Sequence, residues 1–163
     1  MNWRGADRIL AQLRGRIILI EGNHDPMSSI HRDGWMHRAQ WTGEGKFEAI
    51  VAFMRRRSGG KEFLLSHYPY SGDHASRDRP EGTDRHTQYR LRDEGMWLLH
   101  GYTHSREKYS GTYRREWLPR GSEMHWQFRG RQIHVGVDAW NLKPVSESAV
   151  LDLMKSLDSA PEG

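Results

Sequence analysis

Cysteine is absent from this 163-residue chain, which excludes disulfide bonds and thiolate metal sites. Long apolar runs are absent too, since no stretch reaches the roughly 18 apolar residues of a membrane-spanning helix. No apolar segment typical of a signal peptide follows the first four residues. We therefore predict a cytoplasmic protein in a reducing compartment, with no membrane partner. The sequence does not indicate the oligomeric state.

Apolar and aromatic residues are frequent enough to build a folded core. Hydrophobic residues make up 36% of the chain, which contains seven Trp and six Tyr, and a disordered chain is poorer in aromatic residues. The length suits one domain better than two, so we predict a domain over residues 1–157 and a tail over 158–163. The net charge of +4 permits an anionic substrate, including nucleic acid.

Short apolar runs alternate with polar turns along the chain. The hydrophobic periodicity predicts helices over residues 6–13 and 146–157, the second with Ser146 as its N-cap. The continuous apolar runs at 17–20 and 97–99 predict strands buried on both faces. Further strands are expected at residues 47–53, 62–66, 124–128 and 132–137, the last two as a hairpin. This alternation indicates an α/β fold.

Three of the predicted strands end in a loop that carries histidine. His24 follows the strand at 17–20, His67 follows the next, and His100 and His104 follow the third. In sheets covered on both faces, ligands bind outside the carboxyl ends of the strands. We therefore expect these histidines to come together. A single strand-end histidine is usually structural, but three such strands point to a site.

The residues around these histidines form recognisable motifs. GNHD stands at residues 22–25, SH at 66–67 and GYTH at 101–104. In this order they resemble the GNH[DE], single-His and GHxH motifs of the calcineurin-like metallophosphoesterases. Residues 67–74 and 135–140 also resemble the small phosphoesterases of bacteriophages and actinobacteria. The resemblance implies an α/β sandwich of two mixed sheets flanked by helices.

The resemblance also implies a chemistry. Members of the family hydrolyse phosphomonoesters or phosphodiesters with two divalent ions, which clamp the phosphate and generate a hydroxide nucleophile. Imidazole, carboxamide and carboxylate ligands suit Mn, Fe, Zn or Ni. The implied partner is a phosphate-ester substrate, with nucleotides and nucleic acid left open.

The family's residue roles transfer to matching positions of this chain. By resemblance, Asn23 and His67 would ligate the second metal and His104 the first. His24 would lie over the phosphate and stabilise or protonate the leaving oxygen, and Asp25 would orient His24. Structural alternatives stay open, since Asn23 also suits a left-handed turn and His67 a backbone hydrogen bond at the strand end. We interpret His100 as structural or as a support for the ligands.

The loop from residue 71 to residue 87 is rich in arginine. Arg77, Arg79 and Arg85 follow the predicted ligand His67 in sequence, and arginine pairs well with phosphate oxygens. We predict that these three residues bind substrate. The alternative is a solvated surface loop without a role in binding.

Two departures from the family pattern bear on activity. The DxH and GD motifs that open the family are missing before residue 17, so the predicted fold is incomplete at its N-terminus and the first metal keeps only His104. Tyr102 stands where the family has a histidine ligand of the second metal, and a neutral phenol is a weaker ligand than imidazole.

Two other functions remain open at this stage. The chain could be a truncated, metal-poor remnant that is inactive or acts as a binding module. It could also be a nucleic-acid-binding protein, an interpretation that rests on its arginine content alone. A metal titration separates the enzyme from the remnant.

Overall fold

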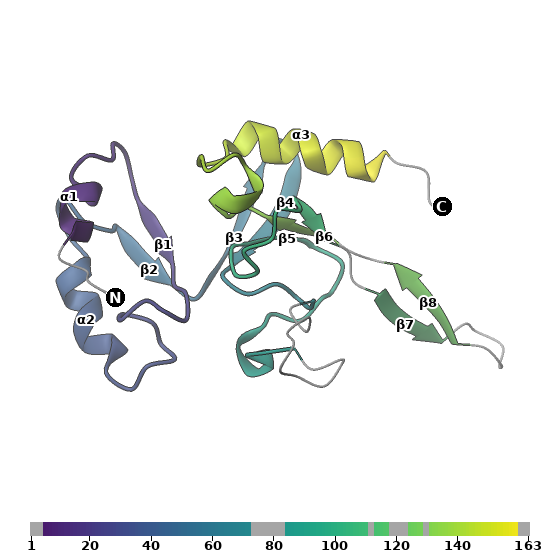
Figure 1. Cartoon of the computed structure of the whole chain (residues 1–163), viewed down its shortest axis with the longest axis horizontal. Helices are drawn as coiled ribbons and strands as arrows, with labels where there is room; N and C mark the ends of the chain where they lie inside the picture. Colours follow the sequence, from purple (N-terminus) through teal and green to yellow (C-terminus); the bar gives the residue numbers. More distant parts are fainter. Residues whose placement is uncertain (1–4, 73–83, 111–112, 118–123, 129–130, 160–163) are drawn as a thin grey trace. The chain divides into compact units, whose positions relative to one another are not determined.

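Figure 1 shows the fold of the chain as a computed structural model, which describes residues 5–72, 84–110, 113–117, 124–128 and 131–159. The chain divides into two compact units, unit 1 over residues 1–54 and unit 2 over residues 55–163. Each unit is described by itself. That residues 1–157 form one domain stays a prediction.

Unit 1 combines two short strands with two helices. Strand β1 (Ile18–Ile20) lies parallel to β2 (Ala49–Val51). Helix α1 (Ala6–Leu10) precedes β1, and α2 (Gly34–Trp41) lies between the two strands in sequence. Parallel neighbours require a crossover connection, and the segment that contains α2 supplies it.

The core of unit 1 is small. Leu10, Met27, Phe47 and Ile50 are buried together, with Leu19 packed against them. Strand β1 lies where it was predicted, but the expected burial of both its faces is wrong. Ile18 is 39% exposed, because successive side chains of a strand point to opposite faces and the face of Leu19 is the one that meets the core.

Unit 2 is built on a five-stranded mixed sheet in the order β3-β4-β5-β9-β6. The strands are β3 (Phe53–Ser58), which begins at the boundary between the units, β4 (Lys61–Ser66), β5 (Trp97–His100), β6 (Tyr109–Ser110) and β9 (Gln132–His134). Strands β4, β5 and β9 run parallel, and β6 runs antiparallel to β9. Polar loops leave the carboxyl ends of these three parallel strands.

The segment 124–128 pairs with a different partner from the one predicted. Strand β8 (Met124–Phe128) is antiparallel to β7 (Tyr113–Trp117) in a separate two-stranded sheet. The predicted hairpin between residues 124–128 and 132–137 is therefore wrong. Strand β9 has β5 on one side and β6 on the other, so both of its backbone edges are occupied and neither is available to β8.

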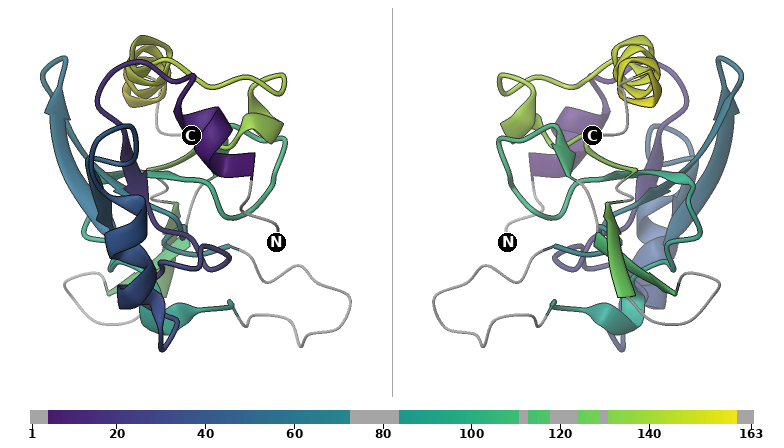
Figure 2. Two further views of the ribbon diagram at one scale, coloured as in Figure 1. Left: turned by 90° about the vertical axis from the view of Figure 1, so that its left-hand side faces the viewer. Right: turned by 90° about the vertical axis from the view of Figure 1, so that its right-hand side faces the viewer.

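Helix α3 (Glu147–Asp158) covers one face of the five-stranded sheet. Figure 2 shows this helix almost along its axis. Val150, Leu151 and Met154 recur at helical spacing and pack on Phe63 and Ile133 of the sheet. The predicted N-cap is confirmed, since Ser146 Oγ accepts a hydrogen bond from the Ala149 backbone N–H at 3.2 Å.

Two short 3-10 helices complete the described part of unit 2, η2 (Thr87–Tyr89) and η3 (Val137–Ala139). Across the described ranges, no helix is both long and apolar enough to cross a membrane. The protein is thus of the mixed α/β class, with sheets and helices, as the sequence indicated.

Candidate functional site

The carboxyl ends of β4, β5 and β9 form one edge of the unit 2 sheet, and each carries a histidine. His67 directly follows the last residue of β4, His100 ends β5 and His134 ends β9. His100 and His134 stand opposite each other in the parallel register, with ring centroids 5.4 Å apart. Within unit 2, the expected clustering of strand-end histidines is confirmed for His67 and His100. For His24, in unit 1, it stays a prediction.

His134 was not identified from the sequence. It directly precedes residues 135–140, the segment that resembles the phage phosphoesterases, and this neighbourhood could have marked it. The pairing of β9 with β5 shows that it stands opposite His100. A Cβ atom on Gly136 would come within 2.6 Å of His134 Nε2. The glycine therefore allows the chain to pass closely over the imidazole after β9.

The His100 and His134 imidazoles are buried and neutral. Burial, followed by the neighbouring His134, lowers the pKa of His100 to about 3. Burial likewise lowers the pKa of His134. A hydrogen bond to the Gly101 carbonyl, whose oxygen lies 3.4 Å from Nε2, acts in the opposite direction. Neither ring nitrogen of His100 has a hydrogen-bond partner within the described part of the chain. At neutral pH the pair therefore adds no positive charge to the sheet edge.

Aromatic rings surround His67 on the same side of unit 2. We call the following five residues the aromatic cluster: His67, Tyr68, His86, Tyr89 and Tyr102. The buried ring of Tyr102 stands edge-on to His67 with centroids 5.4 Å apart. The structure thus brings together two residues that the sequence proposed for one metal. The contact is one of packed rings.

Arg85 extends the aromatic cluster with a positive charge. Its exposed guanidinium lies over the ring of Tyr102, 5.3 Å from the centroid, a cation–π geometry. The two other arginines predicted to bind substrate, Arg77 and Arg79, lie outside the described residues. Of the three arginines, Arg85 is therefore the one that lies within the described residues.

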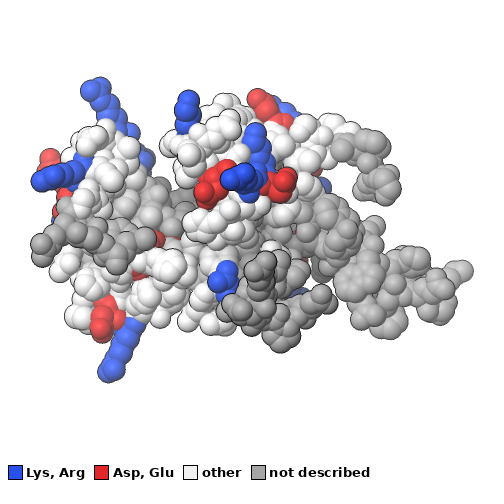
Figure 3. Space-filling view, in the orientation of Figure 1, with Lys and Arg blue, Asp and Glu red and all other residues white. Residues whose placement is uncertain are grey.

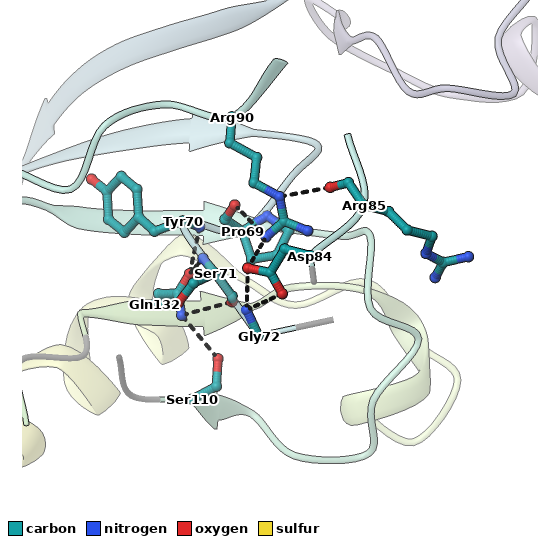
Figure 4. A network of polar contacts seen from close by, with 9 residues as sticks. All are labelled: Pro69, Tyr70, Ser71, Gly72, Asp84, Arg85, Arg90, Ser110 and Gln132. Carbon is teal, nitrogen blue, oxygen red and sulfur yellow. Dashed lines mark hydrogen bonds and ion pairs between the residues drawn. The ribbon is translucent and has the colours of Figure 1, made fainter. Parts of the chain in front are cut away.

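A buried glutamine anchors the loop that follows His67 (Figure 4). Gln132 is fully buried. Its Oε1 accepts from the backbone N–H of Tyr70 at 2.5 Å and from that of Ser71 at 3.3 Å. Its Nε2 lies within hydrogen-bonding distance of the Ser71 carbonyl and the Ser110 hydroxyl. Strand β9 therefore fixes the backbone just beyond the predicted ligand.

An ion pair ties the same loop to the segment that carries Arg85 (Figure 4). The backbone N–H of Gly72 donates to both carboxylate oxygens of Asp84, at 3.1 and 3.0 Å. Arg90, whose side chain is 4% exposed, lies 3.4 Å from the same carboxylate. It also donates to the carbonyls of Pro69 and Arg85. Residues 84–90 are thereby held against the chain that leaves β4.

His104 is positioned by a carboxylate. Its Nδ1 lies 3.1 Å from Asp138 Oδ2, and its backbone is left-handed with φ 50°. A carboxylate on one ring nitrogen orients an imidazole, as in many metal sites. Asp138 was not predicted as a site residue, although it stands in the segment that resembles phage phosphoesterases.

The GNHD motif forms a compact turn in unit 1. The Asp25 carboxylate accepts from the Gly22 backbone N–H at 2.7 Å, and burial raises the pKa of Asp25 even though this hydrogen bond opposes the shift. His31 Nε2 lies 3.1 Å from the Asn23 carbonyl, and the His24 side chain is exposed. The orienting contact from Asp25 to His24 stays a prediction.

A buried ion pair holds the base of this turn. Glu21, at the end of β1, is 5% exposed and pairs with Arg38 of α2. It also accepts from the Ser29 backbone N–H at 3.0 Å. Arg38 donates further to the carbonyls of Met27 and Ile50, at 3.1 and 3.0 Å. This pair was not predictable from the sequence, because the two residues meet only through the fold of α2.

The predicted ligands meet only part of what the metals implied by the resemblance require. Imidazole and carboxamide suit transition metals, and His67 and His104 lie in unit 2 with Asn23 in unit 1. Within the described ranges, however, no group of three His, Asp or Glu side chains is placed to hold a metal ion. Metal binding stays a prediction.

Charges on the face shown in Figure 3 are interspersed. Lys and Arg side chains lie beside Asp and Glu, and among the residues drawn in colour there is no broad patch of one sign. Several basic residues are engaged in exposed pairs, such as Arg56 with Glu147 and Arg55 with Glu62. This face does not resemble the continuous basic surface of a duplex-binding protein.

Taken as a class, the chain is a mixed α/β protein with a histidine-rich edge on its parallel strands. No established protein-family profile matches it. It is 38% identical over 150 residues to the "Gene 66 protein" of Mycobacterium phage L5, a match that covers 88% of this chain and 61% of that protein. For the "Gene 66 protein" of Mycobacterium phage D29 the values are 39% over 137 residues, 82% and 58%.

The chain therefore spans about three fifths of the length of these curated relatives. Among solved structures, it is similar to the protein of unknown function AQ665 from Aquifex aeolicus, with a TM-score of 0.50 and 22% identity. That match covers 92% of this chain and 67% of the other. At this identity the likeness shows a shared fold alone.

Proposed function

We propose that this chain is a calcineurin-like metallophosphoesterase that hydrolyses a phosphomonoester or phosphodiester. The observation that carries the proposal is the common sheet edge of β4 and β5. There His67 meets the GYTH loop, with the Tyr102 ring against its imidazole. Strand ends of parallel sheets are where α/β proteins bind their ligands. The two phage relatives accord with the phage-type resemblance of residues 67–74 and 135–140.

Each predicted residue has a role in this proposal. Asn23, His67 and His104 would hold divalent ions, which, when bound, supply Lewis-acid stabilisation of the phosphate and an activated water. Asp138 orients the His104 imidazole through its Nδ1. His24 donates a proton to the leaving oxygen, and Asp25 steadies the turn that presents it.

Arginine adds positive charge at the proposed phosphate site. The strand-end pair His100 and His134 is neutral, because burial lowers the pKa of both imidazoles. Arg85, by contrast, is always charged and exposed beside the aromatic cluster. Arg85 would therefore add a positive charge for a phosphate near His67, beside that of the bound metal ions.

A second candidate is a metal-poor binding module. It is favoured by one specific observation, the lack of any three-ligand group of His, Asp or Glu within the described ranges. Tyr102 in place of a histidine points the same way. In this case the strand-end loops would bind a phosphate ester without cleaving it.

The test is a manganese titration combined with hydrolysis assays. The chain, its His67→Ala variant and the control His37→Ala are dialysed against Mn²⁺, and metal content and hydrolysis of bis(4-nitrophenyl) phosphate and 4-nitrophenyl phosphate are measured. We expect metal-dependent turnover that EDTA abolishes and His67→Ala lowers by about 10²-fold or more. His37 lies on α2 and is not one of the predicted site residues, so its variant should match the wild type.

The Gene 66 protein of phage L5 is assayed in parallel. Metal-dependent hydrolysis by this longer relative, with a silent 163-residue chain, would favour the binding module for the chain. Failure of both proteins to bind metal or turn over any phosphate ester would remove the phosphoesterase proposal.

A first prediction concerns the tyrosine of the GYTH loop. Tyr102→His replaces a neutral phenol by an imidazole, a better ligand for Mn or Zn, beside His67. We expect affinity for the metal to rise by about tenfold or more, measured by equilibrium dialysis. Tyr102→Phe serves as the control, because it keeps the ring packing and offers no ligand. Equal metal affinity of the two variants would contradict a ligand position at residue 102.

A further inference from the structure

The aromatic cluster is exposed to solvent on one side. Tyr89 is 43% exposed, while its ring stacks on the buried Tyr68 with centroids 6.2 Å apart and an interplanar angle of 23°. His86 is partly exposed and tilts against the same Tyr68 ring at 5.4 Å. Arg85 lies beside them with an exposed guanidinium. We call Arg85, His86 and Tyr89 the 85–89 surface.

The 85–89 surface is anchored by the residues on either side of it, Asp84 and Arg90. Arg90 follows it, almost fully buried, and binds Asp84, the Pro69 carbonyl and the Arg85 carbonyl (Figure 4). His86 has a left-handed backbone, φ 54°. Such a conformation in a residue other than glycine has an energetic cost that the surrounding contacts must offset. A rigid aromatic surface loses little entropy when a flat ligand stacks on it.

The distance from this surface to the predicted metal ligand is short. His67 and Tyr89 both pack on Tyr68, with centroids 5.0 and 6.2 Å from it. One ring thus separates the place where a phosphate would bind from the exposed aromatic faces. In a nucleotide, one ribose separates the phosphate from the base. Arg85, next to the rings, carries the charge that a phosphate requires.

We propose that the 85–89 surface stacks the base of a nucleotide-type phosphate ester, with His86 and Tyr89 against the base and Arg85 on a phosphate oxygen. The inference rests on the proposed function, since it names the substrate class of that same site. Every nucleobase has a flat π-face, so stacking on tyrosine or histidine selects nucleotides without selecting one base. A sugar phosphate offers no such face.

Equilibrium dialysis in EDTA tests this inference without turnover. The two ligands are adenosine 5′-monophosphate and ribose 5-phosphate, which differ by the base alone. We expect the nucleotide to bind about tenfold more tightly, the effect of stacking one base on an aromatic side chain. Tyr89→Leu should remove this difference and Tyr89→Phe should keep it. Trp35→Leu, at a 71% exposed aromatic of unit 1, is the control and should behave as the wild type.

Arg85→Ala adds an independent test of the charge. It should lower the affinity for both ligands by the same factor, because both contain the phosphate and only one contains the base. Equal affinities of the wild type for the two ligands would overturn base stacking, as would a base preference that survives Tyr89→Leu. Unchanged phosphate affinity in Arg85→Ala would overturn the assignment of the phosphate contact.

Hydrolysis then separates this inference from the proposed function. With Mn²⁺ present, the 4-nitrophenyl ester of thymidine 5′-phosphate is compared with methyl 4-nitrophenyl phosphate. Cleavage of both at equal kcat/KM would support the phosphoesterase and overturn base stacking. A base preference in EDTA without cleavage in Mn²⁺ would support the stacking surface and overturn the phosphoesterase.

Discussion

The two loops that carry the predicted site residues are anchored in opposite ways. In unit 1, the turn after β1 rests on a charged pair, Glu21 with Arg38, both within the same short stretch of chain. In unit 2, the loop after β4 rests at Tyr70 and Ser71 on a neutral amide, Gln132, from a strand far along the sequence. The Asp84–Arg90 pair holds the same loop at Pro69 and Gly72. The Glu21 anchor is local and ionic, whereas the Gln132 anchor is distant and uncharged. The two loops should therefore respond differently to mutation and to acid.

The largest effect is expected at the ionic anchor. Arg38→Ala leaves the Glu21 carboxylate buried with Ser29 as its remaining described donor. Breaking a fully buried ion pair costs about 3–5 kcal/mol. Arg38 is 32% exposed, so we expect a loss of about 3 kcal/mol, at the low end of this range, measured by urea unfolding. Arg16→Ala, at the exposed pair with Glu48, is the control and should change stability little. A loss below about 1 kcal/mol for Arg38→Ala would show that Glu21 does not depend on its partner.

The close approach of α2 to the same turn gives the next effect. A Cβ on Gly34 would collide with the Ser28 carbonyl, which is backbone and cannot rotate away. We expect Gly34→Ala to destabilise the protein by about 1–3 kcal/mol, the range for overpacked sites. Gly5→Ala is the matched control, since nothing lies within 4 Å of the added atom. Equal urea midpoints for the two variants would contradict the packing of α2 on this turn.

Low pH should lower the stability of unit 2 through its buried imidazole pair, His100 and His134. The pKa of His100 falls to about 3 on folding, from an ordinary value near ~6.5. Between these values the unfolded state binds the proton and the folded state does not, so stability is lost as the pH falls through ~6.5 and is constant above it.

The expected size is about 2 kcal/mol between pH 7.5 and pH 5, taking one proton at about 1.4 kcal/mol per pH unit below ~6.5. The measurement is the difference in urea stability between the wild type and His100→Leu at each pH, which cancels the titration of other groups. His37→Gln is the control. A difference that does not change with pH would contradict a neutral His100 in the fold.

The smallest effect is expected at the amide anchor. Gln132→Met keeps the volume but leaves the Tyr70 and Ser71 N–H groups without their acceptor. Losing hydrogen bonds to buried groups costs about 1–2 kcal/mol here. The exposed Gln40→Met should change nothing. If Gln132→Met cost as much as Arg38→Ala, the contrast between the two anchors would not hold.

Local features of the fold were predictable from the sequence. The ends of β1, β4 and β5 and the N-cap of α3 all depend on residues close together in the chain, such as Ser146 and Ala149. Strand β8 pairs with the segment just before it, β7, which the sequence had not indicated as a strand. The partner of β9 is β5, more than thirty positions earlier. His134 was missed for the same reason, since its importance comes from standing opposite His100.

The anchors of the site were hidden from the sequence in a similar way. Nothing in the neighbourhood of Gln132 indicates that its side chain reaches the backbone of Tyr70, 62 positions away. Glu21 follows an apolar run like many exposed residues, and only the course of α2 buries it against Arg38. Residue types near a strand end therefore suggested the chemistry, while the residues that hold them required the structure.

The bond between Gly72 and Asp84 has a consequence for how this protein can change over generations. It joins the two residues that flank residues 73–83. The entropy of closing a loop grows slowly with its length, so each doubling adds only about 0.6 kcal/mol. A longer segment between residues 73 and 83 would therefore add little closure entropy for the bond between Gly72 and Asp84 to offset. A lineage can thus vary the length of this segment at small cost while Asp84 still pairs with Arg90.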